Sequence, residues 1–188
     1  MTQSAVLALL HQHQTEFEEE LAFLAQTISF VMQQDAFWQR STLEGHLTGS
    51  AWVCSADGGA VLLLHHAKLD RWLQPGGHVD AEDSSLVETA RREAMEECGM
   101  KVLELYSPGI FDLDVHEIPA RGAEPAHFHY DLRFLFHVPE GTQIERNLLE
   151  TKAIAWLNLE ELCSASTPMS LRRMALKSLN FQRDSERF

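Results

Sequence analysis

The sequence predicts an α/β protein in which a mixed sheet lies between helices. Short β-rich runs stand on both sides of one strongly helical stretch, and a second amphipathic stretch follows near the end of the chain. Apolar residues make up 45% of the 188 residues, which is enough for one domain with a substantial core. We expect a helical extension at residues 1–46 and the main domain at residues 47–188.

The N-terminal segment 3–34 is expected to be helical, because it lacks Gly and Pro and repeats apolar residues at helical spacing. The favoured interpretation is an extension packed on the domain, and a dimerisation helix or a lid over the site are the alternatives. Residues 48–54 and 60–65 are β-rich and flank an Ala-Asp-Gly-Gly turn, which is typical of a hairpin. The later expected elements are a helix at 84–98, strands within 101–119, 126–139 and 153–157, and a helix at 167–181.

The charge balance limits the classes of partner. Acidic residues outnumber basic ones 28 to 15, and the formal charge of −13 argues against a protein that coats nucleic acid, since phosphate contacts need Lys and Arg. A phosphorylated small molecule stays compatible, because a bound metal ion supplies positive charge locally. The three cysteines form no CxxC pair, and we find neither a secretory signal nor an apolar run long enough to span a membrane. We therefore expect a cytoplasmic protein without membrane contact.

The stretch 84–98 carries the most informative pattern. Ser85 and Glu88 form an S-x-x-E capping box, and Gly99 is a plausible stop signal. Glu93, Glu96 and Glu97 stand at i, i+3 and i+4, so they share an arc of roughly 100° on the helix. An adjoining arc holds the apolar residues Leu86, Val87, Ala90, Ala94 and Cys98. The acids therefore border the buried stripe instead of lying opposite it.

Three like charges on one short arc repel each other, and partial burial strengthens the repulsion. A divalent cation removes this problem, and carboxylate oxygens are the ligands that Mg²⁺ prefers. The alternative for the triplet taken alone is a solvated acidic face with Arg91 and Arg92 as partners.

The residues around the triplet resemble the Nudix box. That signature is a Gly, five residues, a Glu, seven residues, Arg-Glu, an apolar residue, one residue, Glu-Glu, one residue, Gly and an apolar residue. Gly77 resembles the opening glycine, and residues 92–100 match the second half at every fixed position. Asp83 stands in place of the first Glu, and eight residues instead of seven separate it from Arg92. In the family this acid braces the box through the Arg, so the departure concerns the loop more than the metal site.

The resemblance extends to residues 62–80, 111–136 and 150–162, which are similar to strands and loops of a bacterial Nudix subgroup. It covers roughly residues 48–165 and implies a Nudix α/β/α sandwich, with 47–188 as the hydrolase domain. The implied reaction is hydrolysis of the diphosphate in a nucleoside diphosphate linked to another group. A non-catalytic nucleotide-binding or regulatory module on the same fold is the alternative, and isomerisation of an isoprenyl diphosphate is disfavoured because nothing around Cys54 matches that pattern.

The resemblance also implies roles for individual residues. Glu93, Glu96, Glu97 and the carbonyl of Gly76 would hold Mg²⁺, for which Mn²⁺ is an alternative, and Arg92 would orient the carboxylates through ion pairs. The base that takes a proton from the attacking water would be a box glutamate, Glu93 or Glu97, or an acid from a later loop. Our later-loop candidate is Glu150, with an ordinary surface glutamate as the alternative. Glu145 and Glu160 are weaker candidates.

Ten histidines are a high number for this length. His127 and His129 alternate and would share one face of a strand. We expect His78, His127 or His129 to contact substrate phosphate or base; a transition-metal site and ordinary polar strand positions are the alternatives.

Substrate contacts are also expected just before the glycine pair. There Lys68 would reach a phosphate, and Trp72 would either stack on a base or belong to the core. The basic residues of the last helix, Arg172, Arg173 and Lys177, are expected on a solvated face. The expected partner is a small nucleotide, not a nucleic acid, and a homodimer through the N-terminal extension is one further expectation.

Overall fold

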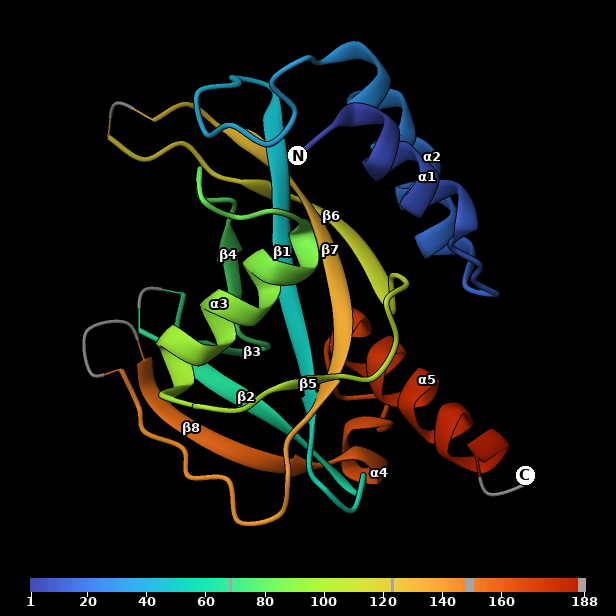
Figure 1. Ribbon diagram of the computed structural model, residues 1–188, viewed down its shortest axis with the longest axis vertical. Coiled ribbons are helices and arrows are strands. Elements are labelled where there is room, and N and C mark those ends of the chain that lie inside the picture. The colour runs from blue at the N-terminus through green and yellow to red at the C-terminus, as the bar shows by residue number, and fades with distance from the viewer. Residues whose placement is uncertain (68, 123, 148–150, 186–188) are drawn as a thin grey trace. The chain divides into compact units, whose positions relative to one another are not determined.

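The computed structural model describes residues 1–67, 69–122, 124–147 and 151–185 (Figure 1). The chain divides into two compact units, which we describe separately. The first consists of Met1–Ser50, Gly76–Arg92 and Ser107–Phe134, and the second of Ala51–Pro75, Glu93–Tyr106 and Leu135–Phe188. The predicted boundary at residues 46 and 47 stays a prediction.

The first unit begins with two helices, α1 (Gln3–Gln12) and α2 (Glu18–Gln33), which lie side by side in Figure 1. The expectation of continuous helix over residues 3–34 was therefore wrong. The break has a tertiary cause, because the side chains of His13 and Thr15 in the connection both bind the carboxylate of Glu20. The other ring nitrogen of His13 lies 3.1 Å from the carbonyl oxygen of Ile110.

The sheet of the first unit is mixed, as the sequence predicted. Its strands are the beginning of β1 (Gly45–Cys54), β4 (Gly76–His78), β6 (Asp112–Ile118) and most of β7 (His127–His137). β4 pairs antiparallel with β1, and β6 pairs antiparallel with β7. β1 and β7 are neighbours in the sheet. They run parallel, because Phe128 N–H donates to the carbonyl of Glu44 just before β1, and Asp131, further along β7, accepts from Thr48 and Ser50, further along β1. Helix α2 packs on β6, and the ring of Phe30 stacks 4.1 Å from that of Tyr130.

The second unit is built around strand β2 (Ala60–His66). β2 pairs antiparallel with the end of β1, which confirms the predicted hairpin, and with β3 (Arg71–Leu73) and β8 (Thr151–Asn158). The short strand β5 (Glu104–Leu105) pairs with the end of β7. Two helices follow, α4 (Leu159–Leu162), which the sequence did not predict, and α5 (Met169–Ser185).

Helix α5 covers the core of the second unit. The indole N–H of the fully buried Trp52 donates to the hydroxyl of Ser178 at 2.8 Å. The expectation of a solvated basic face on this helix was wrong, because Arg173 is only 2% exposed. Its neighbours Arg172 and Lys177 are half-buried, so this face of α5 turns toward the unit. Among the described residues, no helix is long and apolar enough to cross a bilayer.

Candidate active site

Helix α3 (Leu86–Cys98) carries the acidic triplet and has the ends that the sequence predicted. At its start, the backbone N–H of Glu88 donates to the hydroxyl of Ser85 at 3.3 Å, and that of Thr89 donates to the Ser85 carbonyl at 3.0 Å. At its end, Gly99 adopts a φ of +60°, the left-handed conformation that terminates helices. The predicted apolar arc is buried at Leu86, Ala90, Ala94 and Cys98 and half-buried at Val87.

The three glutamates differ in exposure. Glu96 is exposed, Glu93 is half-buried, and Glu97 is only 6% exposed. A carboxylate that is taken out of water favours a positively charged partner, and three carboxylates within one turn offer hard oxygen donors to a divalent cation. These three glutamates could therefore hold a hard divalent cation. Burial and the neighbouring charge of Glu97 raise the pKa of the Cys98 thiol to about 12, so this sulfur is protonated at neutral pH.

Arg92 is held by Asp83, as the sequence predicted. Its Nε and Nη2 atoms donate to the two carboxylate oxygens of Asp83 at 3.0 and 2.9 Å, and Nη2 also donates to the carbonyl of His78 at 2.9 Å. Asp83 accepts further bonds from the hydroxyl of Thr89 and the backbone N–H of Asp80, both at 2.9 Å. Burial raises the pKa of the Asp83 carboxyl, but the bonds from Arg92 and these neighbours outweigh it and hold the pKa below its usual range.

The same contacts explain how the longer box is accommodated. Asp83 N–H donates back to the carbonyl of Asp80 at 3.0 Å, so residues 80–83 form a closed turn. This turn takes up the additional residue and brings the shorter acid against Arg92.

Gly76 occupies a position that no side chain fits. It lies opposite Ser50 in the β1–β4 register, and a Cβ at Gly76 would lie 2.2 Å from the Ser50 hydroxyl oxygen and 2.6 Å from the Ser50 Cα. The close approach of these two backbones therefore requires glycine. It gives a physical reason for the first glycine of the pair, Gly76, that is independent of any metal.

A later loop packs against the C-terminal end of α3 within the second unit. The backbone N–H of Glu145 donates to the carbonyl of Cys98 at 2.9 Å, and that of Asn147 donates to the carbonyl of Glu97 at 3.2 Å. A Cβ at Gly99 would lie 2.8 Å from the Cβ of Glu145, so this contact is tight. Glu150, our candidate base, lies outside the described residues, and Lys68 does as well. Glu160 is exposed in α4.

Four histidine rings gather in the first unit, including His46, which the sequence analysis missed. The ring of His46 lies 5.0 Å from that of His78, 5.1 Å from that of His127 and 4.8 Å from that of His129. The shared face of His127 and His129 is confirmed, with 5.2 Å between their rings. His46 precedes Thr48 and Ser50 at alternating positions of β1, and that polar alternation was the signal available in the sequence.

Three of these rings, those of His46, His78 and His129, resist protonation. The pKa of His46 is lowered to about 4, mainly by burial. The neighbouring rings of His78 and His127 and the charge of Arg40 make smaller contributions in the same direction. The charge of Glu124 acts in the opposite direction. The pKa of His129 is lowered to about 2, mainly by burial, and the neighbouring histidine rings contribute less. Those rings are His78, His46, His116 and His127. Burial, followed by Arg40 and His127, lowers the pKa of His78 to about 4. The rings of His46, His78 and His129 are therefore uncharged near neutral pH.

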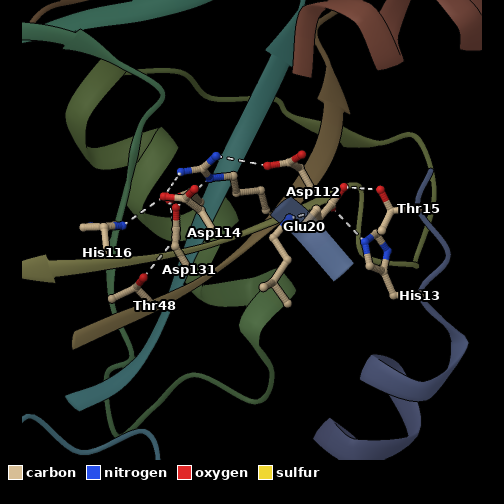
Figure 2. A network of polar contacts seen from close by, with 11 residues as sticks. His13, Thr15, Glu20, Thr48, Asp112, Asp114, His116 and Asp131 are labelled. Atoms are coloured by element: carbon tan, nitrogen blue, oxygen red, sulfur yellow. Dashed lines mark hydrogen bonds and ion pairs between the residues drawn. The ribbon is translucent and has the colours of Figure 1, made fainter. Parts of the chain in front are cut away.

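A second polar network, unforeseen from the sequence, surrounds Arg133 on β7 (Figure 2). The guanidinium contacts three carboxylates, Asp131 at 2.8 Å, Asp112 at 3.0 Å and Asp114 at 3.2 Å. Burial disfavours the charge of Arg133, but the carboxylates outweigh burial and keep its pKa above the ordinary value. The signals in the sequence were the Asp-x-Asp and Asp-x-Arg alternations, which place each pair on one face of a strand.

The network connects β7 to β1. Asp131 accepts hydrogen bonds from the hydroxyls of Thr48 at 2.9 Å and Ser50 at 2.7 Å. Since Ser50 is the register partner of Gly76, the buried charges position the strand that carries the opening glycines of the box. Figure 2 also shows Glu20, whose carboxylate accepts from the backbone N–H of Leu113 at 2.9 Å.

Trp72 lies in the second unit and is half-buried, with its ring 5.2 Å from that of its register partner His65. It is thus neither a core residue nor fully exposed.

Comparisons with known proteins agree with this geometry. The family model described as the NUDIX domain matches residues 45–176. The chain belongs to the Nudix family. It is therefore a pyrophosphohydrolase by class, as the box predicted. A search of curated proteins gives no match.

Solved structures similar to this Nudix protein share its fold. A MutT protein from Methanosarcina mazei Go1 aligns with a TM-score of 0.55 at 20% identity, over 76% of this chain and 98% of that one. The Ap4A hydrolase of C. elegans in a binary complex aligns with a TM-score of 0.52 at 17% identity, over 73% and 98%. The dihydroneopterin triphosphate pyrophosphohydrolase of E. coli aligns with a TM-score of 0.55 at 20% identity, over 71% and 95%.

Proposed function

We propose that this Nudix protein is a Mg²⁺-dependent pyrophosphohydrolase that cleaves the diphosphate of a nucleoside diphosphate linked to another group. The observation that carries the proposal is the acidic face of α3, on which Glu97 is buried and Glu93 half-buried. A buried carboxylate beside two further carboxylates is stabilised by a hard cation.

The proposed ligands of the ion are Glu93, Glu96 and Glu97. The carbonyl of Gly76 is proposed as a further ligand on the basis of its position in the box. When bound, Mg²⁺ supplies charge neutralisation on the phosphate oxygens and a more acidic water, and Mn²⁺ is proposed as a substitute. Arg92 acts as a positioning residue, because its guanidinium is fixed by Asp83 and the carbonyl of His78 at the start of the helical turn that carries the glutamates.

The proton of the attacking water must go to a carboxylate. We propose Glu93, Glu97 or Glu150 as the base. Support for Glu150 comes from the packing of Glu145 and Asn147, because their backbone bonds to the end of α3 bring the start of this loop to the helix that carries the triplet. Attack at phosphorus forms one P–O bond, and the leaving phosphate takes the electron pair of the bridging bond that breaks.

For contacts to the substrate we propose Lys68, Trp72, His78, His127 and His129, as the sequence suggested. An uncharged imidazole donates one hydrogen bond, which suits a phosphate oxygen or a base edge. Two structural relatives are named for small substrates, Ap4A and dihydroneopterin triphosphate, which supports a small nucleotide as substrate here. The charge of −13 supports the same choice over nucleic acid. Cytoplasmic location and a homodimer belong to the proposal, and light scattering on the full chain tests the latter.

The test is a mass-spectrometric screen of a nucleotide panel with Mg²⁺ or Mn²⁺, followed by kinetics on the best substrate. We expect Glu97→Gln to lower kcat by at least about 100-fold, because it weakens the buried charge that holds the metal. The matched control is Glu161→Gln, which changes an exposed glutamate of α4 and should leave kcat unchanged. Near-full activity of Glu97→Gln would show that the metal site is wrong. Nucleotide binding without turnover across the panel would instead favour the non-catalytic module.

A further inference from the structure

Three histidines of the first unit, His46 and His127 buried and His129 half-buried, lie close enough to share one ligand. His46, His127 and His129 each offer a ring nitrogen, and these atoms all lie within 4.8 Å of one another. His46 is 1% exposed and His127 is 6% exposed, so the group faces the interior. All three residues come from two parallel neighbouring strands, β1 and β7, which hold them at fixed separations.

The cluster lacks the partners that buried polar groups normally have. Both ring nitrogens of His46 and the Nε2 atom of His129 are buried without a hydrogen-bond partner. Buried polar atoms in native proteins are almost always bonded, and exceptions point to a water molecule or an ion. His127 behaves differently, because its Nδ1 lies 3.0 Å from the carbonyl oxygen of Pro125. That contact makes Nδ1 the donor and leaves the lone pair of Nε2 available, which is how metal-binding histidines are commonly oriented.

We propose that His46, His127 and His129 form a binding site for a borderline transition-metal ion such as Zn²⁺, separate from the carboxylate site on α3. A zinc ion lies about 2.0–2.1 Å from imidazole nitrogen, hence about 3.2 Å from the ring centre, and tetrahedral geometry then separates ring centres by about 5 Å. The observed separations of 4.8, 5.1 and 5.2 Å match this value.

The chemistry of the donors selects the ion. Three neutral imidazoles suit Zn²⁺, Cu²⁺ or Ni²⁺, whereas Mg²⁺ prefers oxygen ligands such as those on α3. Three protein ligands leave a fourth position, as in zinc sites that also hold water or substrate. The ring of His78, 5.0 Å from those of His46 and His129, borders the cluster without belonging to the ligand set.

This assignment refines the roles on the substrate side. Coordination uses the lone pairs of His127 and His129, so these two rings would act on a substrate only through the ion. His78 keeps the direct role.

The experiment uses the full chain without a histidine tag, stripped with a chelator and then titrated with Zn²⁺ against a chromophoric competitor. We expect one Zn²⁺ per chain with a Kd below about 1 μM, and no displacement by millimolar Mg²⁺. Replacement of Zn²⁺ by Co²⁺ should give the intense visible absorption of a tetrahedral nitrogen-ligated ion. His46→Gln, and separately His129→Gln, should weaken Zn²⁺ binding by at least about 100-fold, since each removes one of three protein ligands.

Two controls separate this site from others. His11→Gln removes an exposed histidine of α1 and should bind Zn²⁺ as the unchanged chain does. Glu97→Gln should also keep full Zn²⁺ binding, whatever it does to hydrolysis. Circular dichroism must show that each variant is folded. If one histidine variant fails to fold, the other still tests the proposal. Absence of Zn²⁺ binding in the unchanged chain overturns the proposal. Zn²⁺ binding that survives both histidine variants, or that is lost in Glu97→Gln, overturns it as well.

Discussion

The buried charges around Arg133 give the sharpest prediction about stability. Arg133→Leu removes a guanidinium that contacts three carboxylates, those of Asp112, Asp114 and Asp131. Asp112 and Asp131 are at most 3% exposed. Removing one partner of a buried ion pair costs about 3–5 kcal/mol, because the remaining charge stays buried without compensation. For a chain of this length, that loss corresponds to a fall in Tm of roughly 6–20 °C.

The measurement is urea denaturation at pH 7, followed by circular dichroism, with Arg121→Leu as the matched control. Arg121 is exposed, so its replacement should change the free energy of unfolding by less than about 0.5 kcal/mol. The Asp131→Asn change in the Arg133→Leu background should recover part of the loss, because it removes one of the stranded charges. A loss of under about 1 kcal/mol for Arg133→Leu would refute the reasoning, since it would mean that the three carboxylates are well solvated.

Two further predictions concern the glycine pair and the histidine cluster. Gly76→Ala should lower the free energy of unfolding by about 1–3 kcal/mol or more, because the new Cβ meets the backbone as well as the side chain of Ser50. The control is Gly109→Ala, which should be neutral in the same denaturation assay because the nearest atom to its new Cβ lies at 3.8 Å. In chelator-treated protein, the uncharged rings of His46 and His129 do not oppose folding above about pH 6.5. Stability falls as the pH drops below about 6.5, through about 4 for His46 and through about 2 for His129, because the unfolded chain binds protons that the folded rings resist. Tm measured between pH 7 and pH 4 should therefore fall, and His46→Gln should flatten that slope; an unchanged slope in this variant would contradict the lowered pKa of His46.

Local sequence determined helix α3 and what it carries. Its first turn is capped by Ser85 and its last is ended by Gly99, and both signals lie within the helix or next to it. Because the glutamates stand at i, i+3 and i+4, helical periodicity alone places them on one face of the helix. The β1–β2 hairpin was predictable for the same reason, since its turn residues lie between the two strands. The Arg92–Asp83 pair could be anticipated only through the resemblance to the Nudix box, because the distance in sequence is not one that a helix dictates.

Only the tertiary structure decided which distant residues meet. Asp131 binds the hydroxyl of Ser50 across 81 positions of sequence, and no local pattern encodes the register that joins them. The same holds for His46, which meets His127 and His129 because β1 and β7 are neighbours. The N-terminal helices separate where long-range contacts of His13 and Glu20 outweigh helical propensity. The sequence by itself thus determined the acidic helix, since neighbours in the chain specify it, whereas strand pairing decided the buried histidine and arginine clusters.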